Sequence, residues 1–237
     1  MKITSLLLIG AVALANGTLW AGTGHQDSID RLHMSSQVLN SIMEAPDKGI
    51  PEEVLSSAEC IVVVPHLMKA AFIVGGQHGR GIASCRTETG WSAPAFISMG
   101  GGSAGLQIGV EGVDLVMLVM NDHGFQHLLS SKFELSGDAS AAAGPVGRHA
   151  SAGTDWKLNT EILTYSRSQG VFAGIALNGA VVQQDSDSTR AIYGRDTSFR
   201  AILSGKVRAP KSTATFMRTI AETGRAGAIA EVSEDKR

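Results

Sequence analysis

Short apolar runs separated by glycine occupy the chain from Cys60 to Gly179, and this pattern constrains the fold more than any other feature. The first run, 61–64, is rich in valine and is followed by Pro65, so it favours an extended chain that ends there. In 106–110 apolar residues alternate with polar or small ones, which is the period of a half-buried strand. Further extended segments are predicted at 72–74, 81–86, 95–98, 104–110, 115–119, 132–135, 161–166, 170–177 and 180–183. So many short strands joined by tight turns predict an antiparallel, glycine-rich sheet that is strongly twisted or partly closed.

Helical patterns flank this region on both sides. Residues 27–43 place apolar side chains on one face, with Asp27 or Ser28 as the N-cap and Pro46 just beyond the end. A short helix is predicted at 51–58, a turn or short helix at 122–130, and two C-terminal helices at 188–203 and 213–223. The sequence therefore predicts an α+β fold with an N-terminal helix, a sheet and C-terminal helices. We expect one domain over 22–224 and a flexible tail over 225–237.

The N-terminus has the pattern of a secretory signal peptide. Lys2 precedes the apolar run 6–15, and small residues follow that run. We expect a signal peptide over 1–21, with cleavage after Ala15 as the alternative, and a periplasmic or secreted product. No cysteine lies near either position, so a lipoprotein is not expected. The net charge of −2, or −3 without Lys2, provides no overall attraction for nucleic acid.

Two cysteines, Cys60 and Cys85, both lie in strand-like segments. In an oxidising compartment they predict a disulfide, which would stabilise the fold by roughly 3–4 kcal/mol; two buried free thiols are the alternative. A redox-active C-x-x-C pair is absent from the sequence, and neither cysteine has the ligand spacing of a metal site. His123 and His127 stand four residues apart, but Gly124 lies between them and the sequence shows no third ligand nearby.

The segment 100–105, GGGSAG, matches two motifs by spacing alone. Its glycines fit the dinucleotide fingerprint G-x-G-x-x-G, and Ser103 fits the G-x-S-x-G nucleophile elbow of serine hydrolases. Both motifs need a helix directly after the turn, whereas the following residues alternate as in a strand. A glycine hairpin or bulge is therefore the favoured interpretation, and a hydrolase built on Ser103 is a remote alternative. No cofactor is expected.

Four longer motifs together are more specific: WSAPAF at 91–96, GLQIG at 105–109, AAGPVGR at 142–148 and YSR..G.FAG at 165–174. In this combination the chain resembles the SYLF domain family, as a bacterial, secreted member. The resemblance implies a non-enzymatic lipid-binding domain, and it implies actin binding for fungal members. An exported protein would not meet actin, so no actin partner is expected.

The expected function is association with lipid or a membrane surface in the periplasm; an interaction or structural module for an envelope protein partner is the alternative. The candidate lipid contacts lie on the amphipathic helix, just beyond it, and within family-like motifs. They are Ile29, Arg31, Leu32, Lys48, Arg80 and Arg148. Of the four arginines in such motifs, Arg80, Arg86, Arg148 and Arg167, we expect at least two to form structural pairs instead.

Overall fold

The computed structural model describes residues 9–44, 49–72, 74–104, 109–146, 160–168 and 171–234. The helices are α1 (Ile9–Met43), α2 (Glu52–Ser57), α3 (Asp122–Leu129), α5 (Ser186–Tyr193), α6 (Phe199–Leu203) and α7 (Ala214–Glu234), with the 3-10 turn η2 (Lys211–Thr213). The strands are β1 (Cys60–Phe72), β2 (Val74–Thr87), β3 (Gly90–Trp91), β4 (Ala95–Ala104), β5 (Gly109–Val119), β6 (Lys132–Glu134), β7 (Ala141–Ala143), β8 (Ile162–Ser168), β9 (Val171–Gly174) and β10 (Val181–Gln184). The predicted α+β class, with an N-terminal helix and C-terminal helices, is confirmed.

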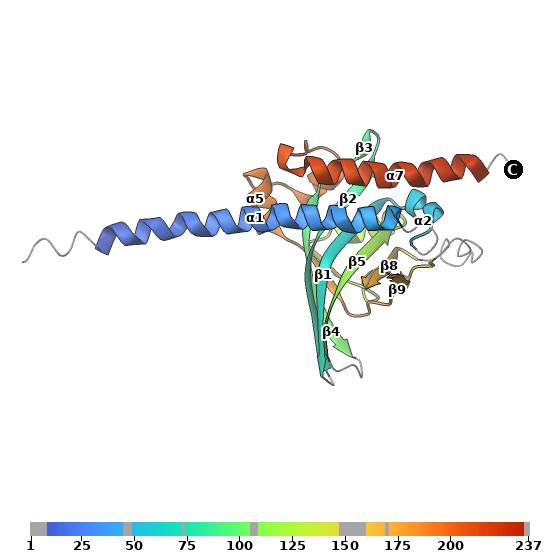
Figure 1. The fold of residues 1–237 in the computed structure, drawn as a ribbon, viewed down its shortest axis with the longest axis horizontal. Helices are drawn as coiled ribbons and strands as arrows, with labels where there is room; N and C mark the ends of the chain where they lie inside the picture. Colours follow the sequence, from blue (N-terminus) through green and yellow to red (C-terminus); the bar gives the residue numbers. More distant parts are fainter. Residues whose placement is uncertain are drawn as a thin grey trace, which may run out of the picture.

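One curved sheet organises the molecule (Figure 1). Its main path runs in the order β6-β10-β4-β2-β1-β5-β8-β7, with β3 paired to β2 and β9 paired to β8. The prediction of a purely antiparallel sheet is wrong at one place, because β7 runs parallel to β8. The segment 144–161 between these two strands is long enough for the crossover that parallel neighbours require. The sheet is therefore mixed.

The central strands are longer than the sequence predicted, because glycine does not interrupt them. Residues 100–102 continue β4 and pair with 76–78 of β2, so the predicted hairpin or bulge at these glycines is wrong. At Gly101, φ is +150°, and a Cβ atom would lie 2.6 Å from the carbonyl oxygen of Gly179. Glycine is needed there because the chain from another part of the sheet passes against its backbone.

Pro65 does not end the first strand, contrary to the prediction. β1 continues through a bulge, since its register shifts against β5 between Val64 and Leu67. The extra residue places His66 at φ 51°, and its backbone N–H donates to the Asp114 carboxylate at 3.1 Å. A bulge leaves residues outside the regular hydrogen-bond ladder, which lets a proline without an N–H occupy a central strand.

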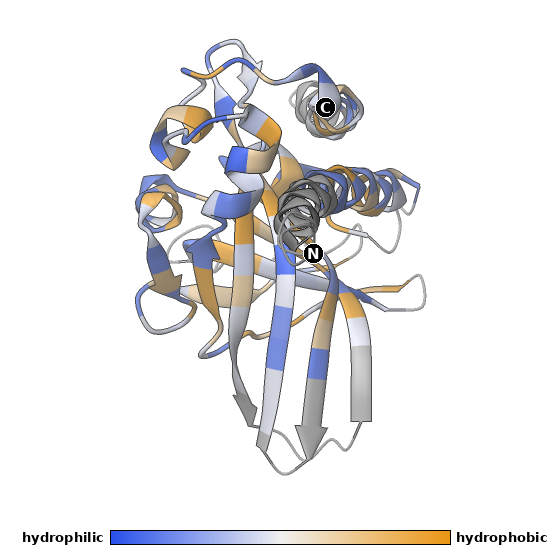
Figure 2. Ribbon diagram, turned by 90° about the vertical axis from the view of Figure 1, so that its left-hand side faces the viewer, coloured by the Kyte–Doolittle hydropathy of each residue, from blue (hydrophilic) through white to orange (hydrophobic). Residues whose placement is uncertain are grey.

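Two hydrophobic clusters cover the two faces of the sheet. On one face α1, α2 and α7 pack over β1, β2 and β5, and on the other α3 and α6 pack near the disulfide. α1 and α7 lie side by side (Figure 1), and Leu39 of α1 and Phe216 of α7 are both buried. The strands extend beyond the helical layer, where hydrophilic positions appear along them (Figure 2). α1 begins at Ile9, so the predicted start at Asp27 is wrong, whereas α2 begins after Pro51 as predicted.

The motifs AAGPVGR and YSR..G.FAG meet at one buried tyrosine. Tyr165 in β8 is fully buried, and a Cβ atom on Gly144 would overlap its ring. A Cβ atom on Gly174, which faces Tyr165 across the β8–β9 pair, would overlap the backbone of Gly144. These glycines are required by close packing around the tyrosine. The two motifs therefore describe one packing cluster rather than two separate sites.

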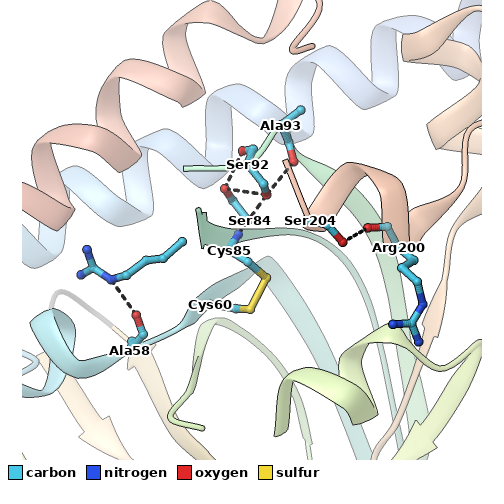
Figure 3. Close-up of a disulfide and its surroundings, with 9 residues drawn as sticks. Ala58, Cys60, Ser84, Cys85, Ser92, Ala93, Arg200 and Ser204 are labelled. Atoms are coloured by element: carbon cyan, nitrogen blue, oxygen red, sulfur yellow. Dashed lines mark hydrogen bonds between the residues drawn. A yellow bond between two sulfur atoms is a disulfide. The ribbon is translucent and has the colours of Figure 1, made fainter. Parts of the chain in front are cut away.

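The cysteines are joined in a disulfide, as the sequence predicted. Cys60 at the start of β1 lies opposite Cys85 near the end of β2 in the strand register, and the two sulfurs are bonded (Figure 3). Both residues are buried. Nearby, the Ser92 hydroxyl accepts the backbone N–H of Cys85 at 3.0 Å. The disulfide thus ties the first two long strands together at the end of the sheet that the helices cover.

Candidate functional site

The predicted lipid contacts on α1 are largely turned into the domain. Arg31 is 4% exposed; its guanidinium donates to the Asp185 carboxylate at 3.1 Å and lies 5.5 Å above the ring of Phe96. Leu32 is buried, and Ile29 packs against the same hydrophobic cluster. Lipid contact at these residues stays a prediction, and it requires α1 to leave the sheet. Lys48 and Arg148 lie outside the described residues.

Asp185 holds the other end of this contact and also caps α5. Burial alone would raise the pKa of Asp185, but hydrogen bonds from the Ser188 backbone N–H and hydroxyl, together with Arg31, outweigh it. The pKa of the carboxyl group is therefore held below its usual value. Burial lowers the pKa of Arg31, and Asp185 offsets part of this effect. The pair is an internal contact between α1 and the start of α5.

Two of the four motif arginines are structural, as predicted. Arg86 donates to the carbonyl oxygens of Leu55 and Ala58 at the end of α2, and it stacks 4.8 Å above Trp91. Arg167 pairs with Asp114 at 3.4 Å. Arg80 differs from both. It is exposed on β2, and it makes no hydrogen bond or ion pair within the described part of the chain.

The glycines on either side of Arg80 show which face of the sheet its side chain lies on. Gly79 and Gly81 face the bulged strand β1, and a Cβ atom at Gly79 would lie 2.7 Å from Val64. Because successive strand residues point to opposite faces, His78 and Arg80 lie on the other face, which carries α1. The QHGRG sequence at 77–81 thus combines close strand packing on one side with exposed polar side chains on the other.

These side chains line a polar depression of about 370 Å³ where α1 passes the start of α5. Arg80 of β2 pairs in register with Ser98 of β4, and Ser98 pairs with Gln183 of β10. Three neighbouring strands therefore bring one row of polar residues together, and the chain continues from this row into α5. The lining residues are His78, Arg80, Ser98, Gln183, Gln184, Asp185, Ser186 and Asp187.

Five of these lining side chains have no partner among the described residues. They are His78, Arg80, Ser98, Gln183 and Ser186. A second depression of similar volume shares Gln184 and Ser186 with the first, but there Arg190 is already bonded to Asp196 at 2.7 Å. Converging polar groups without internal partners are the groups that a ligand can satisfy. The first depression is therefore the better candidate site.

The sequence identified only part of this site. Arg80 was among the predicted contacts, whereas Ser98, Gln183 and Ser186 were not. The one sequence signal was the alternation of polar residues with glycine at 77–81.

Ser103, the hydrolase candidate, lies within β4 opposite Gly75, not on a turn that opens a helix. Within the described ranges, no three His, Cys, Asp or Glu residues are close enough to hold a metal ion. None of the helices described has the length and apolar character to span a membrane.

The fold defines the class of protein: an α+β domain built on one curved, glycine-rich sheet with helices on both faces. The chain belongs to the Ysc84 family, the family with the SYLF domain, as the sequence motifs predicted. Residues 100–223, just over half of the chain, match this family, which is described as "Las17-binding protein actin regulator".

Named relatives are about one third identical to the chain over the residues that align with it. Protein YSC84 of Saccharomyces cerevisiae is 32% identical over 178 residues, which covers 73% of this chain and 38% of the yeast protein. LAS seventeen-binding protein 3 of the same yeast is 31% identical over 178 residues, with 73% and 39% covered. The mouse SH3 domain-containing YSC84-like protein 1 is 34% identical over 167 residues, with 70% and 49% covered. The chain thus spans less than half the length of each of these relatives.

Proposed function

We propose that this protein is a non-enzymatic, peripheral lipid-binding domain of the periplasm or cell envelope, and that the polar depression around Arg80 takes up a lipid headgroup. One observation carries the proposal: five polar side chains from β2, β4, β10 and the start of α5 converge there without internal partners. Ser98 is half-buried and the other four side chains are exposed, so a ligand would replace water as their hydrogen-bonding partner.

The contact differs from the predicted one on α1. Within the described part of α1, Leu32 and Ile29 pack in the hydrophobic cluster and Arg31 pairs with Asp185, so these three residues are engaged inside the domain. Arg80 keeps its full hydrogen-bonding capacity and is exposed. A guanidinium donates several N–H groups in a fixed plane and is well suited to phosphate oxygens. Lipid phosphate is therefore the group that we expect beside Arg80.

Vesicle sedimentation tests the proposal. We expect the purified chain to sediment with phospholipid vesicles at low salt, and Arg80→Gln to weaken this binding about tenfold, as loss of one charge-assisted hydrogen bond predicts. Arg208→Gln provides a matched control, because Arg208 is exposed and does not line the depression. Failure of the unmodified chain to bind any vesicle, or equal losses for the two variants, would refute the proposed site.

A protein partner in the envelope is the second candidate function. The names of the relatives favour it, since the family is described as Las17-binding and one yeast relative is a LAS seventeen-binding protein. Recovery of one stoichiometric partner from the envelope, together with no vesicle binding, would favour this function over lipid binding.

A further inference from the structure

The depression around Arg80 presents opposite charges from two sides. Arg80 lies on β2, and Asp185 and Asp187 lie where β10 leads into α5. β4 separates β2 from β10 in the sheet, so the two flanking strands are about 10 Å apart. The depression that Arg80 and these two carboxylates line has room for a small ligand. The charges of that ligand must match both sides.

The two carboxylates are not equivalent. Asp185 is 12% exposed and is neutralised by Arg31, so it is already satisfied. Asp187 is 95% exposed, and among the described residues its ion-pair partner is Arg190, at 3.4 Å. Arg190 makes its shorter bond, 2.7 Å, to Asp196. An exposed ion pair of this kind is weak, so Asp187 remains available to a ligand cation.

The available charges are therefore one cation, Arg80, and one anion, Asp187. Asp187 repels a simple phosphate, and Arg80 repels a simple amine. A ligand that carries a phosphate and an ammonium group a short distance apart satisfies both residues. Ser98, Gln183 and Ser186 line the same depression and add neutral hydrogen-bonding groups.

We propose that the depression is a site for a phosphate–ammonium zwitterion of the phosphoethanolamine class, with the phosphate at Arg80 and His78 and the ammonium group at Asp187. The volume of about 370 Å³ is at the lower end for small-molecule sites, which suits a headgroup without its acyl chains. The assignment to a lipid rests on the proposed function. The same chemistry also occurs in free phosphoethanolamine and its soluble esters.

The match between the charges of the ligand and those of the site is tested by titrating the full chain with phosphoethanolamine, inorganic phosphate and ethanolamine. NMR chemical shifts of the protein report the binding of each probe. We expect phosphoethanolamine to bind about threefold more tightly than inorganic phosphate, and more tightly than ethanolamine, since it makes both charged contacts. Asp187→Asn should weaken phosphoethanolamine binding about threefold, as expected for an exposed ion pair, and leave phosphate binding unchanged or stronger. Arg80→Gln should weaken both phosphate-containing probes. Asp122→Asn, which makes the same charge change at the start of α3, serves as the control.

Equal binding of phosphate and phosphoethanolamine, or no effect of Asp187→Asn, overturns the inference. A second experiment distinguishes the zwitterion site from the proposed lipid-binding function. It compares binding to phosphatidylcholine vesicles that contain either phosphatidylethanolamine or phosphatidylglycerol. Vesicle binding could depend on Arg80 without a preference for phosphatidylethanolamine and without an effect of Asp187→Asn. That result supports the proposed function and overturns the zwitterion site. Binding of soluble phosphoethanolamine without vesicle binding supports the site with a soluble ligand and overturns the lipid proposal.

Discussion

Replacement of Arg31 by methionine tests whether this residue has a structural role. The guanidinium is 4% exposed and lies 3.1 Å from the Asp185 carboxylate, which is itself 12% exposed. Methionine keeps much of the apolar stem that packs near Phe96, but it removes the charge and the hydrogen bond. The Asp185 carboxylate is then left in a poorly hydrated position, with Ser188 as its remaining partner.

The expected loss follows from that arrangement. Removal of one partner of a buried ion pair typically costs about 3–5 kcal/mol. Asp185 keeps two hydrogen bonds from Ser188, so we expect a smaller loss in the free energy of unfolding, about 2–3 kcal/mol. For a chain of this size each kcal/mol lowers Tm by about 2–4 °C, so the expected decrease is about 4–12 °C.

A double-mutant cycle with Arg31→Met and Asp185→Asn, measured by urea denaturation, isolates the pair. We expect a coupling energy of about 1–3 kcal/mol. Because the folded pKa of Asp185 is lowered, its stabilisation is present above the unfolded pKa of about 3.9 and is lost as the pH falls through the folded value. Arg31→Met should therefore reduce the loss of stability in acid. A coupling energy below about 0.3 kcal/mol with an unchanged Tm would show that Arg31 is not paired in solution and is free for a ligand.

Two further predictions concern the packing glycines and the disulfide. Gly144→Ala should lower the free energy of unfolding by at least about 2 kcal/mol in urea denaturation, because its Cβ atom overlaps the ring of Tyr165. Gly24→Ala, in a helix with nothing within 4 Å of the new Cβ atom, should cause no loss; an equal loss in both variants would contradict the packing argument. Cys60→Ser combined with Cys85→Ser should cost about 3.5 kcal/mol, as expected for a 25-residue separation, and intact mass should show the unmodified protein two protons lighter than its reduced form. An unchanged mass on reduction would exclude the disulfide.

Local patterns predicted many of the elements of the fold. Pro51 at the start of α2 is a signal confined to a few residues, and α3 was expected as a turn or short helix at 122–130. Strand lengths were not predictable in the same way. A run such as 100–102 stays extended because β2 pairs with it along its length, and that partner comes from another part of the chain.

The candidate site was predicted only where one residue was informative by itself. Arg80 was predicted because it lies in a family-like motif, but Ser98 and Gln183 come from other strands that only the sheet register brings alongside. Arg31 illustrates the opposite case. Its place on an amphipathic helix predicted a surface contact, yet its partner Asp185 lies 154 positions away in the sequence.

The sequence alone therefore determined the family, the α+β class, the cysteine pair and the positions of α2 and α3, because each depends on residue identity or on local periodicity. The predicted helix at 188–203 is wrong, since the structure has two helices there, α5 and α6. The tertiary structure decided strand length, the parallel β7–β8 pair, the burial of Arg31 and the composition of the polar depression. These features depend on which distant segments meet. Side-chain burial and hydrogen bonding are set by those neighbours in space, and a local sequence pattern does not contain them.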